Sequence, residues 1–278
     1  MRQVFSNYAR RKLLDDPKTV VLLGDIGVGG FMTNNDQLLD RAYNFGINEQ
    51  AMISCAAGMS SQGYTVYLHT IAAFLIERAY EQIKLNCSYN QYKLILVSAN
   101  GPFDYEKLGP THFCANDVPL LSLLENINIF LPSCSSQVDR ALSISHSSPE
   151  SSYIRLTSRS SSEELMEIEE NLFAHSKNAE RQKCIIALGE AMAYVSERRL
   201  WEDYDIFQPL NLELNIENVV QTYEEVVFLE PYSRSTYNNF FKDSKYVFLT
   251  FQNQFQKKIQ HNKGWDDFDK YFQERNRD

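Results

Sequence analysis

The fold is decided by residues 40–82, DRAYNFGINEQAMISCAAGMSSQGYTVYLHTIAAFLIERAYEQ, which predict two helices on either side of one strand. Residues 48–61 are rich in Ala, Ser and Gly, so the first helix is expected to pack very closely on its neighbours. Residues 64–69 predict the strand, and residues 74–87 predict the second helix. Glu49 begins the first helix. An acid at this position is, taken alone, only a favourable charge at the positive end of the helix dipole. Its role therefore depends on what the rest of the chain places beside it.

Outward from this stretch, short apolar runs that predict strands alternate with segments that predict helices. Further strands are expected at residues 19–23, 92–98, 127–131 and 153–156, and further helices at residues 2–14, 118–124 and 137–145. Such alternation is typical of a parallel sheet with helices on both faces, and ligands bind beyond the carboxyl ends of its strands. Side chains that follow predicted strands or begin helices are therefore expected to converge on one crevice. They are Glu49, Thr70, Phe74, Asn100 and His112.

A Ser-rich, acidic passage at residues 157–170 interrupts this pattern. Ser161 and Glu164 have the spacing of a capping box, which predicts a linker helix. We therefore expect one domain over residues 1–160, a linker over 161–180 and a second domain over 181–278. In the second domain, strands are expected at residues 184–189, 206–214, 226–229 and 246–250, with helices at 190–201 and 264–278. The predicted class is α/β, with two three-layer αβα domains, a parallel sheet in the first and a smaller mixed sheet in the second.

The totals exclude several classes of function. The chain has 278 residues, and its 27 basic against 36 acidic side chains give a net charge of −9, which disfavours broad binding to nucleic acid or to anionic membranes. The five cysteines are scattered without metal-ligand spacing, so reduced thiols and no metal site are expected. No signal peptide and no apolar stretch of roughly twenty residues is seen, which predicts a cytoplasmic protein. Residues 25–30, DIGVGG, lack the Lys-Ser/Thr ending of a phosphate loop, so a turn is favoured there.

Three separate motifs carry a resemblance to a known family. They are FGINEQAMISCAAGMSSQGY at 45–64, HTIAAFLIERAYEQIK at 69–84 and GPTH at 109–112. Together they resemble the C-terminal half of transketolase and of the related deoxyxylulose-phosphate synthases, over the pyrimidine-binding domain at roughly residues 1–160. More faintly, KCIIALGEAM at 183–192 and VVFLEP at 226–231 resemble the C-terminal domain of the same enzymes. The family's N-terminal half, with its Gly-Asp-Gly motif, has no counterpart in this sequence.

The resemblance implies thiamin diphosphate as cofactor and a split enzyme. A second polypeptide would supply the diphosphate-binding domain and hold Mg²⁺ (or Ca²⁺), and an α₂β₂ heterotetramer is expected. Glu49 matches the acid that bonds N1′ of the aminopyrimidine and promotes loss of the thiazolium C2 proton. Phe74 matches the aromatic that stacks on the pyrimidine, although without the motif it would be read as core packing. Ile47, Thr70 and Ile71 are expected around the cofactor, with Ile71 in place of a second Phe of the family.

The resemblance also implies an altered substrate side. His112 matches the histidine that faces the substrate's oxygen atoms. Leu108 stands where the family has Asp, Asn100 where it has His, and Asn116 where it has an acid. A buried site without those partners would not hold an ordinary ketose phosphate in the usual way. The arginines that follow the strand at 153–156 are phosphate contacts or solvated surface, and the residues leave both readings open. They are Arg155 and Arg159.

Three functions are compatible with these features. The first is one subunit of a thiamin diphosphate-dependent transketolase-like enzyme, which moves a two-carbon ketol unit onto a carbonyl or sugar acceptor. The second is the β-type subunit of a 2-oxo-acid decarboxylating enzyme. The GPTH and IERAYEQ motifs favour the transketolase-like function over this one. The third is a non-catalytic assembly partner, which the substituted polar positions support and the retention of Glu49 opposes.

Overall fold

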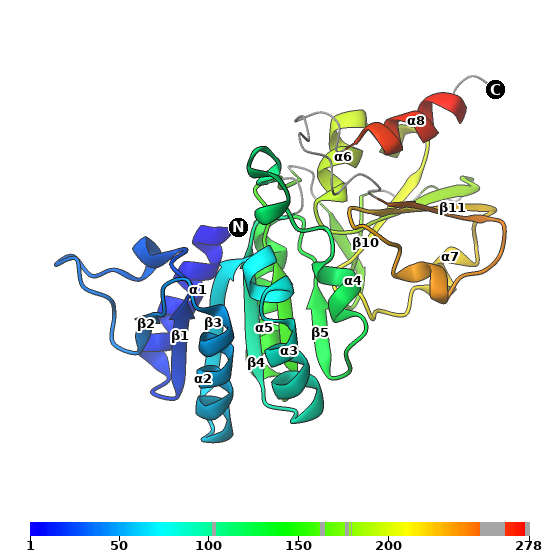
Figure 1. The fold of residues 1–278 in the computed structure, drawn as a ribbon. Helices are drawn as coiled ribbons and strands as arrows, with labels where there is room; N and C mark the ends of the chain where they lie inside the picture. The colour runs from blue at the N-terminus through cyan, green and yellow to red at the C-terminus, as the bar shows by residue number, and fades with distance from the viewer. Residues whose placement is uncertain (102–103, 162–164, 176–177, 179, 251–264, 276–278) are drawn as a thin grey trace.

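The computed structural model describes residues 1–101, 104–161, 165–175, 178, 180–250 and 265–275. Figure 1 shows two αβ domains side by side, with the C-terminal helix above the second. Within the described residues there are two sheets of six strands each, and helices cover both faces of each sheet. The predicted α/β class with two three-layer domains is confirmed. No helix of the described chain is long and apolar enough to cross a bilayer.

The first sheet is parallel throughout, as predicted. Its strands are β1 (Thr19–Leu23), β2 (Ala42–Asn44), β3 (Thr65–Ile71), β4 (Leu94–Ala99), β5 (Ile127–Phe130) and β6 (Ser151–Arg155), in the order β2-β1-β3-β4-β6-β5. The central strands are buried along their whole length, which is why they read as continuous apolar runs. Strand β2 is not predicted from the sequence, because this edge strand has three residues and buries only Ala42.

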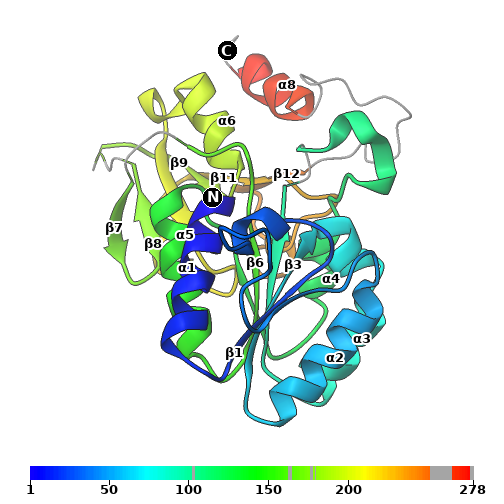
Figure 2. The ribbon, with the colours of Figure 1, turned by 90° about the vertical axis from the view of Figure 1, so that its left-hand side faces the viewer.

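Helices cover the two faces of this sheet in separate groups. On one face lie α1 (Arg2–Asp15) and α5 (Ser135–Ser147), and on the other lie α2 (Glu49–Ser61), α3 (Tyr80–Ile83) and α4 (Asp117–Leu121). Figure 2 shows α1 beside α5, with α2 and α3 across the sheet from them. The helix expected at residues 74–87 differs from the prediction in detail. Its two ends, Ala73–Glu77 and Lys84–Tyr89, are π-helical turns around the short α3. Such turns occur often at functional sites.

The second sheet is mixed, as predicted, but it is not smaller than the first by strand number, because the two strands from the expected linker bring it to six. Its strands are β7 (Met166–Glu169), β8 (Leu172–Ala174), β9 (Lys183–Ala187), β10 (Asp205–Pro209), β11 (Glu225–Glu230) and β12 (Tyr246–Thr250), in the order β12-β11-β9-β10-β8-β7. The β7–β8 and β8–β10 pairs are antiparallel, and the others are parallel. Helices α6 (Ala191–Arg198) and α8 (Asp266–Arg275) pack on one face through Tyr194, and α7 (Glu217–Val220) packs on the other. Short 3-10 turns complete the chain at Val28–Phe31, Glu106–Thr111, Leu200–Glu202 and Tyr237–Asn239.

The segment expected as a linker helix is different in the structure. Residues 166–174 form β7 and β8, which join the second sheet, and Asn171 makes the turn between them with a φ of 63°. The strand β8 is fully buried against β10; its Leu172 and Ala174 pack with the second sheet, whereas Phe173 packs in the cluster that contains α1 and α5 of the first domain. Glu164, the acid of the expected capping box, lies outside the described residues. The second sheet therefore takes its first strands from the middle of the expected linker.

The two domains share hydrogen bonds and a core. The backbone N–H of Leu131 donates to the carbonyl of Leu210 at 2.8 Å, and that of Leu212 donates to the carbonyl of Ile129 at 2.9 Å. Apolar side chains of both domains belong to one buried cluster, which contains Leu121 and Leu131 of the first and Leu212 and Val220 of the second. The domain interface is thus continuous with the core.

A buried ion pair lies beneath this interface. The Asp117 carboxylate, at the start of α4, contacts Nε of Arg155 at 2.9 Å and accepts a hydrogen bond from the Tyr153 hydroxyl at 2.5 Å. Arg155 also donates to the carbonyl of Cys114 at 2.9 Å, and its guanidinium lies over the ring of Tyr232 from the second domain. Both charged groups are buried, so neither has water as an alternative partner.

A second buried carboxyl group, Glu190, reaches across the interface from the loop before α6. It accepts a hydrogen bond from Thr157 at 3.1 Å and lies so close to Gly101 that a Cβ there would be 2.2 Å from its Oε2. Burial raises the pKa of Glu190 to about 8, against the opposing effect of the positive charges of Arg155 and Arg159. In the folded state the Glu190 carboxyl group is therefore largely protonated near neutral pH.

We expect Asp117→Ala to lower the free energy of unfolding by roughly 3–5 kcal/mol, because it leaves the Arg155 guanidinium buried without its charge partner. Urea unfolding followed by circular dichroism measures this change. The matched control is Asp139→Ala, which removes an exposed pair with Arg11 at 3.2 Å and should cost less than about 1 kcal/mol. Similar losses in the two variants would contradict the assignment of Asp117 as a structural anchor.

We expect the stability of the protein to fall as the pH rises from about 5 to about 8, relative to the Glu190→Gln variant. The raised pKa of Glu190, about 8, means that the folded state holds this proton after the unfolded chain has released it. Each pH unit in that window then costs up to about 1.4 kcal/mol. Urea titrations at several pH values measure the difference, with the exposed Glu170→Gln as control. Parallel pH dependences for wild type and Glu190→Gln would contradict this expectation.

Candidate active site

Glu49 is the first residue of α2, and its side chain is buried, with 1% of its surface exposed. Its Oε2 accepts a hydrogen bond from Nη1 of Arg78 at 2.8 Å, which makes a half-buried ion pair. Its Oε1 is buried and has no hydrogen-bond partner within the described chain. A buried carboxylate oxygen without a partner costs free energy, so the arrangement is ready for a donor from outside this chain.

Arg78 joins Glu49 to Phe74. Its guanidinium carbon lies 4.1 Å from the centre of the Phe74 ring, a cation–π contact between the π-helical turn and the residue that directly follows it. Arg78 is not among the site residues predicted from the sequence. The signal was present, because residues four apart lie on one face of a helix and Arg78 follows Phe74 by four. Phe74 itself is half-buried, with the Arg78 guanidinium over its ring.

His112 meets the same aromatic ring from the loop that follows β4. Its ring centre lies 5.1 Å from that of Phe74 in an edge-on arrangement, and 6.0 Å from that of Tyr105. The Thr111 hydroxyl lies 2.9 Å from its Nδ1. Gly109, with a φ of 73°, lets the GPTH turn bring the histidine back over the π-helical turn. The structure thus brings together Glu49, Phe74 and His112.

Three other residues expected around the cofactor take different positions. Thr70 is buried and donates from its hydroxyl to the carbonyl of Gly24 at 3.0 Å, which fixes the end of β3 against the end of β1. Ile71 is also buried at the end of β3. Ile47 is 73% exposed on the loop before α2. Thr70 therefore shapes the sheet edge, whereas Ile47 faces outward beside Glu49.

The expected substrate residues are dispersed. Asn100 is buried with a φ of 75°, and its Oδ1 accepts a hydrogen bond from Arg2. Leu108 is 55% exposed, and the Arg159 guanidinium lies 5.9 Å from the ring centre of Trp265. Arg155 is neither a phosphate contact nor solvated surface, because it is buried in the ion pair with Asp117.

Asn116 links the candidate site to the second domain. Its Nδ2 donates to Glu77 at 3.1 Å, and its Oδ1 accepts from the Ser233 hydroxyl at 2.6 Å. Glu77 lies in the turn that carries Phe74, and burial raises its pKa. An amide can donate on one side and accept on the other, which a carboxylate in this position cannot do. The change from an acid to Asn116 thus has a structural reason.

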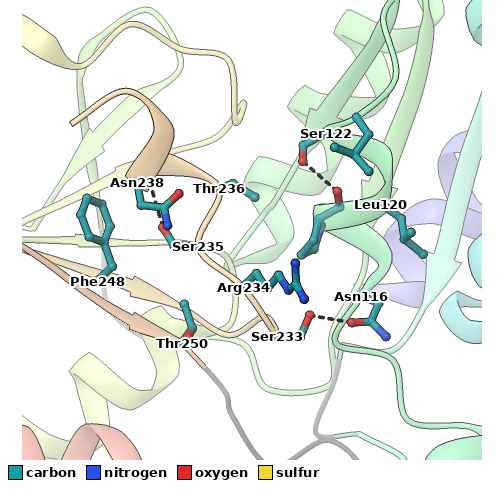
Figure 3. A pocket seen from close by; sticks show the side chains of 12 residues that line it. Asn116, Leu120, Ser122, Ser233, Arg234, Ser235, Thr236, Asn238, Phe248 and Thr250 are labelled. Atoms are coloured by element: carbon teal, nitrogen blue, oxygen red, sulfur yellow. Dashed lines mark hydrogen bonds between the residues drawn. The ribbon is translucent and has the colours of Figure 1, made fainter. Parts of the chain in front are cut away.

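The Asn116–Ser233 bond lies in an open groove of about 900 Å³ between α4 and the loop after β11 (Figure 3). Figure 3 shows Arg234 projecting between the two walls, with Phe248 on the β12 side. Hydroxyl groups on the polar wall are already used, since those of Ser235 and Thr236 donate to Glu230. The groove is separate from the cluster of Glu49, Phe74 and His112.

The described residues contain no group of three or more His, Cys, Asp and Glu side chains that could hold a metal ion. All five cysteines lie in the described part and are unpaired, with Cys87, Cys114 and Cys184 buried and Cys55 exposed. The donor set does fit the aminopyrimidine end of a thiamin cofactor. Oε1 of Glu49 lacks a hydrogen-bond partner, and Arg78, which holds Oε2, also lies over the half-buried ring of Phe74.

Comparison with known proteins gives several relatives that match part of the chain. The chain is 36% identical over 117 residues to an uncharacterized 33.6 kDa protein in the fasciation locus of Rhodococcoides fascians, a match that covers 42% of this chain and 38% of that protein. It is 36% identical over 107 residues to one of the subunits of apulose-4-phosphate transketolase from Actinobacillus succinogenes, covering 37% of this chain and 34% of that one. The matches thus span well under half the length of these relatives.

A solved structure described as a split gene transketolase, inactive beta4 tetramer, has the same fold. It superposes with a TM-score of 0.75 at 20% identity, and the alignment covers 92% of this chain and 90% of that one. The family described as transketolase, pyrimidine binding domain, matches residues 1–162, which are more than half of the 278. The chain therefore belongs to the transketolase family, of which it carries the pyrimidine-binding domain.

Proposed function

We propose that the chain is one subunit of a thiamin diphosphate-dependent, transketolase-like enzyme that transfers a two-carbon ketol unit to a carbonyl or sugar acceptor. The proposal rests on the Glu49 carboxylate, whose two oxygen atoms differ in their hydrogen-bond partners. Arg78 holds Oε2, while Oε1 is buried without a partner in the described chain, beside Phe74. A free oxygen in this position is what N1′ of an aminopyrimidine requires.

Each residue has a distinct part in the proposed chemistry. When bound, thiamin diphosphate supplies the nucleophilic carbon and the electron sink of ketol transfer. Glu49 shares a proton with the pyrimidine nitrogen at Oε1, and Arg78 keeps the carboxylate in one orientation. Phe74 offers its ring to the pyrimidine face. His112, in edge contact with that ring, lies where it can donate to or accept from substrate oxygen atoms.

The second half of the site is proposed to come from another polypeptide. The described chain offers no metal cluster for Mg²⁺ (or Ca²⁺) and the cofactor diphosphate. Next to the buried Glu49, the loop before α2 exposes Ile47 and the edge strand exposes Tyr43, two large apolar side chains that a partner would cover. An N-terminal-half transketolase subunit in an α₂β₂ assembly fits this surface. Two of the similar proteins support the proposal by their names, since one is a subunit of a transketolase and the other is a split gene transketolase.

We expect Glu49→Gln to lower turnover of the reconstituted enzyme by about 10²–10⁴-fold, because a neutral amide replaces the proton-sharing oxygen. The fold should be retained, since the amide keeps the size of the carboxyl group. The exposed Glu81→Gln, on the neighbouring helix, is the matched control and should keep full activity. Wild-type turnover in Glu49→Gln would contradict the assigned role.

Donor preference and cofactor binding separate this proposal from its two alternatives. The pair formed with an N-terminal-half subunit is assayed with pyruvate and with ketose phosphates as donors. Turnover of pyruvate alone would identify a 2-oxo-acid decarboxylating enzyme instead. Circular dichroism of the complex titrated with thiamin diphosphate reports on the pyrimidine site directly. A complex that never binds the cofactor would identify a non-catalytic assembly partner, the reading favoured by the exposed Leu108.

A further inference from the structure

The open groove between α4 and the loop after β11 is separate from the candidate active site (Figure 3). Its volume of about 900 Å³ lies near the upper end of the range of small-molecule sites, roughly 300–1,000 Å³. The first domain lines one wall with the apolar side chains of Pro119, Leu120 and Leu123. The second domain lines the other wall with Arg234 and Phe248. Such sites often lie between two domains, so the lining decides which ligand this groove can hold.

Arg234 brings an unpaired positive charge into the groove. Its side chain is exposed, and Figure 3 shows it pointing into the space between the two walls. No carboxylate of the described chain forms an ion pair with it. The chain has 36 acidic side chains and a net charge of −9, so an arginine left without an acid is notable. A guanidinium offers five N–H donors in a fork that matches a carboxylate or a phosphate group.

Hydrogen bonds on both sides hold the backbone of Arg234 in place. The N–H of Ser233 donates to the carbonyl of Ala115 at 2.9 Å. On the other side, the N–H and the hydroxyl of Thr236 both donate to the buried carboxyl group of Glu230, each at 2.7 Å. The guanidinium therefore extends from a loop whose backbone is already ordered, which reduces the ordering cost of binding a ligand.

The other free polar groups of the lining can also donate hydrogen bonds. The hydroxyl of Ser122 is used within its own wall, since it donates to a backbone carbonyl at 2.9 Å, and that of Ser233 donates to Asn116 at 2.6 Å. The side chains of Asn238 and Thr250 make no hydrogen bond within the part of the chain that the structure describes. None of the described residues that line the groove is acidic. The groove is thus complementary to a negatively charged group that accepts hydrogen bonds.

Two apolar side chains face the groove from opposite walls. The Phe248 ring is stacked on Phe228, with ring centres 5.0 Å apart and an interplanar angle of 19°, and it is half-buried. Leu123, on the opposite wall, is 75% exposed. An apolar body placed between them would remove surface of both side chains from water, which favours binding. An inorganic anion has no such body, so the lining favours an organic ligand.

We propose that the groove binds a small organic anion, a carboxylate or a phosphate ester with an apolar body. The anionic group accepts hydrogen bonds from Arg234, and the body lies between Leu123 and Phe248. A neutral ligand would leave the guanidinium without a counter-charge, and a cationic one would be repelled by it. The proposal does not depend on ketol-transfer chemistry, so it goes beyond the proposed function.

The test measures binding of phenyl phosphate to the full chain by isothermal titration calorimetry. We expect it to bind more tightly than inorganic phosphate, which lacks the body, and than phenol, which lacks the charge. Arg234→Gln, at an exposed position, should raise the Kd by at least about tenfold, the loss expected for a hydrogen bond between charged groups. Asn238→Ala should raise it several-fold. The matched control is Arg11→Gln, another exposed arginine, which lies on α1 and should bind as wild type.

A parallel titration with benzoate distinguishes the two anionic groups. Binding of either anion that is weakened in Arg234→Gln supports the proposal, and the tighter of the two identifies the group. Absence of binding by both anions, or equal affinities in wild type and Arg234→Gln, would overturn it. Asn238→Ala keeps the test decisive if Arg234→Gln does not fold, because an unchanged Kd there also contradicts the proposal.

Two further outcomes would identify a different occupant of the groove or a different site for the probe. Binding that is lost in Phe74→Leu but kept in Arg234→Gln would place phenyl phosphate at the candidate active site. Absence of binding, together with a dimer that dissociates in Leu123→Ser, would show that a second copy of the chain covers the groove. Analytical ultracentrifugation measures the latter. Both results would overturn the proposal, and neither depends on the ketol-transfer assay.

Discussion

The ion pair between Glu49 and Arg78 is the constraint on which the rest of the site depends. A carboxylate free to rotate at a helix start would present either oxygen to a ligand. Arg78 takes one oxygen and lies over Phe74 at the same time, so the acid, the guanidinium and the ring adopt one arrangement. The π-helical turn at Ala73–Glu77 sets the spacing of the ring and the guanidinium. What is left for a ligand is the buried Oε1 of Glu49 and the part of Phe74 that remains exposed.

The order of elements was predictable because buried strands and amphipathic helices have distinct periodicities. Parallel strands such as β4 are buried on both faces and read as continuous apolar runs. The missed elements lack that signal. Strand β2 buries a single residue, and β7 is exposed along its whole length, so neither pattern differs from that of a loop. Their positions follow from pairing with distant strands, which a local pattern does not record.

The site was predictable where chemistry depends on a motif, and not where it depends on contacts across the chain. Glu49, Phe74 and His112 follow from their motifs, and the structure brings them together. The contact between Arg2 and Asn100 joins residues 98 positions apart, and no local sequence pattern near either residue predicts it. Asn116 is similar, since its two hydrogen bonds go to different domains. From the sequence, Asn116 is read as the loss of an acid, whereas in the structure its amide bridges Glu77 and Ser233.

One buried cluster joins the two domains, through Leu121 and Leu131 of the first and Leu212 and Val220 of the second. This shared core determines whether the first domain is stable without the second. A chain of residues 1–160 alone would expose a large apolar surface to water and would tend to aggregate. The two domains are therefore expected to unfold together as one cooperative unit.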